Sequence, residues 1–217
     1  MKKATKILPN LSAKYEILIV EDGSTDNTAE VVDNLKIKYP NVRVIHHKKN
    51  MGYGATMSTA FNNIKLLDII CYIDGDNEYD AQDIVKMIPL LNDYDMIISS
   101  RKIRAYGVYR KFISKFYNRI INQLFHVSFK DINSSTKIFK SSVLQKITIE
   151  SKSSFASAEL IIKAQKKGFK ILEFEIDCSP QKNVYSRTMT VNNIFLTIKE
   201  MSRLFLKQIR LDKSPRI

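Results

Sequence analysis

The sequence is poor in the residues and segments that mark secreted or membrane-spanning proteins. Its 217 residues include only two cysteines, Cys71 and Cys178, and Cys71 lies within an apolar run. A buried free thiol is the expected state of Cys71, so neither a disulfide nor a cysteine metal site is predicted, and a reducing, cytosolic compartment is favoured. The N-terminus lacks the continuous apolar segment of a signal peptide, and no apolar run approaches the roughly 20 residues that span a bilayer.

Acidic residues are scarce relative to basic ones. Lys and Arg number 35, Asp and Glu 22, and the formal net charge is +13. Such an excess predicts an acidic partner, which could be a nucleic acid, an anionic membrane surface or a phosphorylated small molecule. Nucleic acid ranks last, because the sequence has no recognisable nucleic-acid-binding motif.

Repeats, linkers and low-complexity tracts are also absent, and the length suits one globular domain with a sizeable core. Strands are predicted at residues 15–20, 42–46, 68–73, 95–99, 135–140 and 170–178. Helices are predicted from a cap at Thr25 or Asp26 to a stop before Pro40, and at residues 55–66, 81–91, 109–127, 157–167 and 191–209. The alternation predicts an α/β protein with a doubly wound, mostly parallel sheet in residues 1–190, followed by a basic amphipathic helix and tail in 191–217.

Two acidic clusters stand where apolar runs end. Residues 21–26 (EDGSTD) directly follow the first predicted strand, and residues 74–78 (DGDNE) directly follow the third. The carboxyl ends of parallel strands are where α/β proteins bind ligands. Asp74 and Asp76 can both reach one hard cation, and Mg²⁺ or Mn²⁺ binds nucleotide phosphates through few protein carboxylates. The pattern predicts a metal-dependent enzyme that acts on a nucleotide-linked substrate.

The order and spacing of several short motifs resemble those of family-two inverting glycosyltransferases with the GT-A fold, and among them the polyprenyl-phosphate sugar synthases such as dolichyl-phosphate mannose synthase. The resemblance runs from about Tyr15 to Arg187. The matching segments are the nucleotide-binding run at 21–28, the glycine turn at 50–55, the DxD motif Asp74-x-Asp76, the acceptor segment Ser100-Arg101 with Arg110, Ser114 and Asn118, the pair Asp131 and Ser134, and Glu159 with Gly168.

The resemblance implies transfer of a sugar, with inversion, from a nucleotide-sugar to a polyprenyl phosphate. The residues implied in binding the nucleotide-sugar are Asp22, Ser24, Gly52 and Asp74. The cation, Mg²⁺ or Mn²⁺, is assigned to Asp74 and Asp76, with Glu78 at the position of a third ligand. The acceptor phosphate is assigned to Arg101, Arg110, Ser114 and Arg187. The catalytic candidates are Asp76 and Asp131, the latter as a base or an acceptor-side carboxylate.

Each assignment has a simpler alternative. Asp22 could cap the following helix, the DxD acids could be solvated loop carboxylates, and the arginines could belong to a solvated basic face. The three histidines have no metal-ligand spacing beyond the adjacent pair His46 and His47 and are interpreted as structural. The family usually opens with a further strand, and the fourteen residues before Tyr15 do not supply its pattern. A glycan hydroxyl acceptor and a non-catalytic nucleotide-binding remnant therefore stay open as alternatives.

The C-terminal helix predicted at 191–209 has two different faces. One face carries the apolar stripe Ile194, Ile198, Met201, Phe205 and Ile209, and the other carries Lys199, Arg203, Lys207 and Arg210. An ordinary docking helix and an in-plane membrane anchor both fit this pattern. Because a lipid-linked acceptor makes the anchor natural, we expect a cytoplasmic protein held peripherally on the cytoplasmic face of the membrane.

Overall fold

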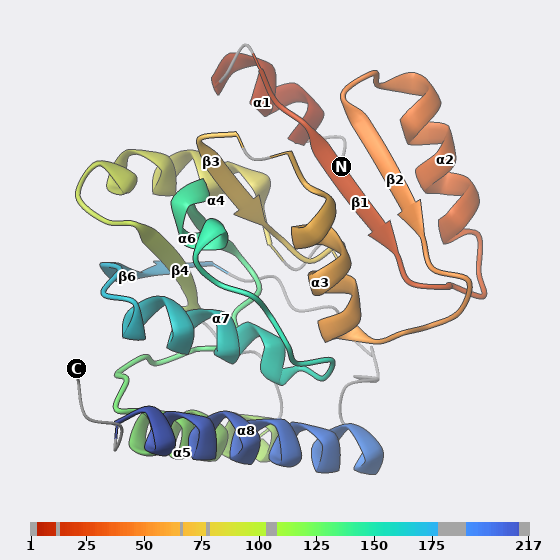
Figure 1. Ribbon diagram of the computed structural model, residues 1–217. Coiled ribbons are helices and arrows are strands. Elements are labelled where there is room, and N and C mark those ends of the chain that lie inside the picture. Colours follow the sequence, from red (N-terminus) through yellow and green to blue (C-terminus); the bar gives the residue numbers. More distant parts are fainter. Residues whose placement is uncertain are drawn as a thin grey trace.

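The computed structural model describes residues 4–11, 14–65, 67–76, 79–102, 108–177 and 190–212 (Figure 1). Six strands lie close to the six predicted segments: β1 (Ile17–Glu21), β2 (Val42–His46), β3 (Ile69–Tyr72), β4 (Met96–Arg101), β5 (Lys137–Lys140) and β6 (Ile171–Ile176). The helices are α1 (Ala4–Leu11), α2 (Thr28–Lys38), α3 (Tyr53–Asn63), α4 (Ala81–Met87), η1 (Ile88–Asn92), α5 (Val108–Phe125), α6 (Ser141–Gln145), α7 (Phe155–Lys166) and α8 (Val191–Asp212). The predicted α/β class is therefore confirmed.

The strands form two sheets. β1 pairs with β2 in parallel, and the second sheet has the order β3-β5-β4-β6. β5 runs antiparallel to both of its neighbours, whereas β4 and β6 are parallel. The strands β3, β4 and β6 thus run in one direction, as a doubly wound sheet requires, and β5 is inserted between two of them.

The N-terminal segment and the third predicted helix differ from the sequence-based expectation. Residues 4–11 form the helix α1, for which no element was predicted, and no described residue adds a strand beside β1 on the side away from β2. The helix predicted at 81–91 ends at Met87 and continues as the 3₁₀ helix η1. Pro89 lies in the first turn of η1, where its missing N–H and its ring prevent an α-helical continuation.

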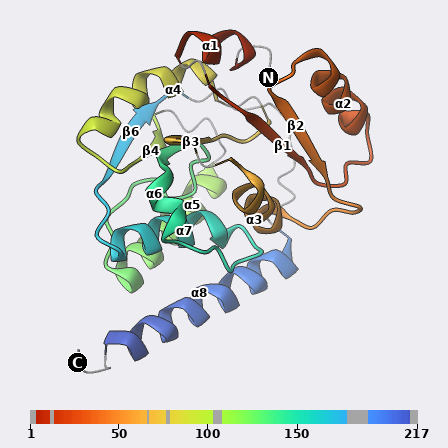
Figure 2. The same ribbon diagram turned by 45° about the horizontal axis from the view of Figure 1, so that its top comes forward.

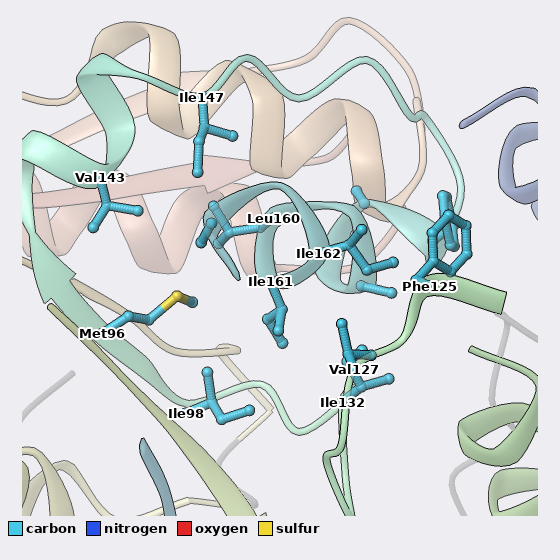
Figure 3. Close-up of a cluster of buried hydrophobic side chains, with 14 of the residues drawn as sticks. Met96, Ile98, Phe125, Val127, Ile132, Val143, Ile147, Leu160, Ile161 and Ile162 are labelled. Atoms are coloured by element: carbon cyan, nitrogen blue, oxygen red, sulfur yellow. The ribbon is translucent and has the colours of Figure 1, made fainter. Parts of the chain in front are cut away.

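The main core forms around α7, which lies between the second sheet and the helices α5 and α8 (Figure 1). Nine of the 12 residues of α7 are buried, so the helix is apolar on nearly every side. Its residues Leu160 and Ile161 gather with Met96 and Ile98 of β4 (Figure 3). Phe125 of α5 joins the same cluster, and the core therefore connects the sheet to the helices beneath it.

The helix α8 lies along the outside of the domain (Figure 2). Its apolar residues differ in how far they are exposed. Met201 and Phe205 pack against the main core, and the Phe205 ring lies 6.1 Å from that of Phe125. Ile194 and Ile198 instead stay about half exposed. The single stripe expected from the sequence is thus divided, because the last turns of α8 dock on α5 and α7 while its first turns extend past them. Within the described ranges, no helix is long and apolar enough to cross a membrane.

Candidate active site

The glycine turn between β2 and α3 is held in place by Asp22 at the end of β1. The Asp22 carboxylate accepts hydrogen bonds from the backbone N–H groups of Met51 (2.8 Å) and Gly52 (2.9 Å). His47 Nδ1 lies 2.7 Å from Asp22 Oδ1, and its Nε2 lies 2.9 Å from Thr59 Oγ1. The alternative in which Asp22 caps α2 is therefore wrong, and the interpretation of His47 as structural is consistent with these contacts.

The N-cap of α2 lies next to Thr25 and Asp26, the two residues that were predicted to cap this helix. The N-cap residue is Asn27, and the Asp26 carboxylate accepts a hydrogen bond from Thr28 N at 3.0 Å. Ser24 is exposed in the same loop, and its backbone N–H donates to Glu21 Oε1 at 2.6 Å. Ser24 therefore lies at the surface of the loop that follows β1.

Two glycines in this region are required by close backbone approaches. Gly23 has φ +65°, and a Cβ at this position would lie 2.4 Å from the carbonyl carbon of Lys49. Gly54 is buried in the first turn of α3, and a Cβ there would lie 2.5 Å from the carbonyl carbon of Lys152. The glycine turn is thus enclosed by the β1 loop on one side and by residues 151–154 on the other.

The DxD acids follow β3, and their surroundings differ. Asp74 is half-buried and accepts a hydrogen bond from the Tyr72 hydroxyl at 3.0 Å, whereas Asp76 is exposed. Burial raises the pKa of the Asp74 carboxyl, and the Tyr72 hydrogen bond opposes that rise. The rings of Tyr72 and Tyr53 meet edge to face at 6.4 Å, and Tyr53 is the first residue of α3. The DxD loop and the glycine turn are therefore neighbours.

A divalent cation fits the pair Asp74 and Asp76 by the chemistry of its donors. Both offer carboxylate oxygens, one at the surface and one partly buried. Within the described residues, no group of three His, Cys, Asp or Glu side chains could hold a metal ion, and Glu78 lies outside them. Mg²⁺ and Mn²⁺ are commonly held by one or two carboxylates together with substrate phosphates, so a two-carboxylate site is sufficient.

Asp131 and Arg101, which were assigned to different roles, form a buried ion pair. Arg101 Nε lies 2.6 Å from Asp131 Oδ2, and Arg101 Nη2 lies 2.8 Å from Asp131 Oδ1. Asp131 is 1% exposed, and its backbone N–H donates to Glu173 Oε1 at 2.8 Å. Both carboxylate oxygens of Asp131 are thus engaged by one guanidinium in the bidentate geometry that arginine favours.

Lys137 is a buried charge that the sequence analysis missed. It is fully buried on β5, and its ammonium group donates to the Ser134 carbonyl oxygen. Burial lowers the pKa of Lys137 to about 8, while the negative charges of Asp74 and Asp131 oppose that fall. Lys137 thus connects the DxD acid to the Asp131–Arg101 pair. The sequence did contain a signal for this burial, because Lys137 directly precedes the apolar Ile138 and Phe139 in a predicted strand.

Two of the residues assigned to the acceptor phosphate, Arg110 and Ser114, lie on the helix α5. Ser114 and Asn118 are one turn apart on the side of α5 that faces the domain, and Asn118 Nδ2 donates to the Lys130 carbonyl oxygen at 2.8 Å, next to Asp131. Arg110 lies one turn earlier on the same face of the helix, but its side chain is outside the description. Arg187 also lies outside the described residues. The roles of these residues stay predictions.

Comparison with known proteins identifies the family. Residues 5–148 match the family model described as glycosyl transferase family 2. The chain belongs to this family. The glycosyltransferase AglD of Haloferax volcanii is 24% identical over 175 residues, which cover 77% of this chain and 28% of that protein. Undecaprenyl-phosphate 4-deoxy-4-formamido-L-arabinose transferase of Edwardsiella ictaluri is 26% identical over 148 residues, which cover 67% of this chain and 45% of that protein. The chain thus spans less than half the length of either relative.

Solved structures show the fold. Glucosyl-3-phosphoglycerate synthase from Mycobacterium tuberculosis, in complex with Mn²⁺, UDP and phosphoglyceric acid, superposes with a TM-score of 0.63 at 14% identity and covers 88% of this chain and 66% of its own. Mannosyl-3-phosphoglycerate synthase from Rubrobacter xylanophilus gives a TM-score of 0.61 at 13% identity, over 93% of this chain and 67% of its own. The predicted GT-A fold is confirmed.

Proposed function

We propose that this chain transfers a sugar from a nucleotide-sugar to a polyprenyl phosphate, in one displacement that inverts the anomeric centre. A phosphate oxygen of the acceptor forms a bond to the anomeric carbon, the bond from that carbon to the nucleotide diphosphate breaks, and the diphosphate leaves. The Edwardsiella relative is named for an undecaprenyl-phosphate acceptor, which supports this choice.

The observation that carries the proposal is the state of Asp131. An anionic phosphate needs no deprotonation before it attacks, whereas a hydroxyl acceptor needs a general base. Both oxygens of the Asp131 carboxylate accept hydrogen bonds from Arg101, and the residue is buried. Both oxygens are thus engaged by the guanidinium and not by an acceptor hydroxyl. The arrangement therefore favours a phosphate acceptor over a glycan hydroxyl.

On the donor side, the glycine turn and the DxD loop supply complementary groups. Asp22 fixes the backbone of the turn against which the nucleotide would lie. Asp74 and Asp76 would hold a divalent cation, which neutralises the charge that develops on the departing diphosphate. The related synthase that was solved with Mn²⁺ and UDP supports the use of a divalent cation, and both Mg²⁺ and Mn²⁺ suit the carboxylate pair.

The proposed activity predicts that sugar transfer requires both a lipid phosphate and a divalent cation. Purified protein is incubated with labelled UDP- and GDP-sugars, with and without undecaprenyl phosphate, and organic-soluble label is measured. We expect label in the organic phase only with Mn²⁺ or Mg²⁺ present, and none after addition of a chelator. Transfer that continues in the chelator would contradict the metal role. Nucleotide-sugar binding without any transfer would favour the non-catalytic alternative.

The exposed apolar residues of α8, which are the candidates for membrane contact, lie nearer the start of the helix than the sequence predicted. Four apolar side chains at the start of α8 are exposed at the spacing of a single helical stripe, namely Val191, Ile194, Phe195 and Ile198. Lys199 and Arg203 are exposed on the same helix. Two more apolar side chains, Phe112 and Phe116, are exposed on α5. Such a combination of aromatic, aliphatic and cationic side chains suits the surface of an anionic membrane.

Vesicle sedimentation tests this contact. We expect the protein to bind anionic vesicles. Each cationic side chain near the membrane surface contributes an attraction of about 1 kcal/mol, and salt screens this attraction. Burial of Phe195 and Ile198 adds a part that salt hardly weakens, so the double variant Phe195→Ser, Ile198→Ser should lose most of the binding that remains at high salt. Ile37→Ser, at an exposed apolar residue of α2, is the control and should change nothing. Equal binding by both variants would make α8 a docking helix only.

A further inference from the structure

The loop at residues 151–154, which encloses the glycine turn, is itself held from two helices. At its start, Glu159 of α7 accepts a hydrogen bond from Ser151 N at 2.8 Å. At the next two residues of the loop, Glu200 of α8 accepts hydrogen bonds from Lys152 N at 2.8 Å, from Ser153 N at 3.2 Å and from Ser153 Oγ at 2.6 Å. Glu200 thus contributes three hydrogen bonds to two consecutive residues of a short loop.

The opposite side of this loop contacts the glycine turn directly. Gly54 N donates to the Lys152 carbonyl oxygen at 3.1 Å. The same peptide unit that carries this carbonyl also carries the Ser153 N–H that Glu200 accepts. In a trans peptide the C=O and N–H groups point in opposite directions. A carboxylate bound to the N–H therefore aims the carbonyl at Gly54.

The contact between the loop and Gly54 leaves little space for adjustment. Because a Cβ at Gly54 would lie only 2.5 Å from the Lys152 carbonyl carbon, the first turn of α3 rests on this peptide without an intervening side chain. Gly52, at the N-cap of α3, donates its N–H to Asp22. The Lys152–Ser153 peptide thus holds Gly54. Gly54 is two residues away from Gly52, whose backbone N–H the Asp22 carboxylate binds.

We propose that Glu200 is a positioning residue for the donor site: it orients the Lys152–Ser153 peptide, and through the contact with Gly54 it sets the conformation of the glycine turn. This inference rests on the proposed function, since it assigns the turn to the nucleotide-sugar. It gives α8 a role in donor binding although the helix lies outside the site. A helix that only docks would contribute to stability and leave the donor affinity unchanged.

Calorimetry of nucleotide-sugar binding and hydrogen exchange of the Gly54 amide test the inference together. The variant Glu200→Ala should weaken donor binding about tenfold, which corresponds to the loss of a hydrogen bond to a charged group, and should leave the KM for the acceptor unchanged. Glu200→Gln keeps an acceptor oxygen and should show an intermediate loss. Both variants should speed hydrogen exchange at the Gly54 amide, and this measurement does not require nucleotide-sugar.

Lys207→Ala is the matched control on the same helix. It removes another charged contact of α8, that of Lys207 Nζ with Glu150 Oε1 at 3.0 Å, which does not touch the glycine turn. This variant should change neither donor affinity nor Gly54 exchange. Gly54→Ala should weaken donor binding by itself, and addition of Glu200→Ala should then have little further effect, because the two residues act through one contact.

The outcomes separate the two proposals. If the wild type binds nucleotide-sugar and Glu200→Ala binds it equally well with unchanged Gly54 exchange, the positioning role is overturned and Glu200 is an anchor of α8 only. If the wild type binds no nucleotide-sugar, the proposed function is overturned and the donor role of Glu200 with it. Faster Gly54 exchange in that case would still show that Glu200 orders the turn.

Discussion

Replacement of Asp76 by Asn is expected to lower kcat about 10²- to 10³-fold, the range seen when one group that stabilises transition-state charge is removed. The change keeps the shape of the side chain and removes one negative charge from the pair that would hold the cation. Because Asp76 is exposed, the free energy of unfolding should change by less than about 0.5 kcal/mol. Steady-state kinetics with saturating nucleotide-sugar and Mn²⁺, together with urea unfolding, measure both quantities.

Asp93→Asn is the control for charge alone. Asp93 is also exposed and precedes β4, at the opposite end of that strand from Arg101. Its replacement changes the net charge by the same amount and should leave kcat unaltered. Equal activity of Asp76→Asn and the wild type would remove Asp76 from the active site and return the DxD acids to solvated loop residues.

The largest effect on stability is expected for Asp131→Ala. The variant leaves the Arg101 guanidinium, only 13% exposed, without its bidentate partner. Removal of one member of a buried ion pair costs about 3–5 kcal/mol. Urea unfolding should show this loss as a lower midpoint at unchanged slope.

The double variant Asp131→Ala, Arg101→Leu should recover part of the loss, since the guanidinium that lost Asp131 is removed as well. Glu175→Ala is the matched surface control. It breaks the ion pair of Glu175 with Lys130, whose side chains are 55% and 76% exposed, and should cost less than about 1 kcal/mol. A similarly small loss for Asp131→Ala would show that the Arg101 pair is solvated in solution. Asp131→Asn that folds and still transfers sugar would exclude Asp131 as the base.

Most of the strands were predictable because they are short, mainly apolar runs that contain β-branched residues. β2 has the predicted bounds, and β4 was placed within two residues. The pairing was not predictable, since residues 137–140 look like any other strand of the chain. Only the tertiary structure shows that β5 enters antiparallel between β3 and β4. This insertion pairs Lys137 with Tyr72, two residues before Asp74, which the local pattern does not reveal.

The assignments of charged residues divide in the same way. The DxD acids could be located from their place after an apolar strand, and the glycine turn from its spacing. The partners of Asp131 and Arg101 could not, because these residues lie 30 positions apart and meet only when β4 and the loop before β5 are packed together. For this reason two residues that were assigned to separate roles prove to be one ion pair.

The helix α8 shows the same limit on a single element. Its apolar periodicity predicted the helix correctly, because a 3.6-residue repeat is a local property of the chain. Which apolar residues face solvent depends on where the domain ends beneath the helix, so Met201 and Phe205 are covered and Phe195 is not. By itself the sequence determined the α/β class, the six strands, most of the helices and the acidic loops. Only the tertiary structure decided the strand pairing, the buried Asp131–Arg101 pair and the contact of Glu200 with the loop at residues 151–154, since these depend on distances between segments far apart in the chain.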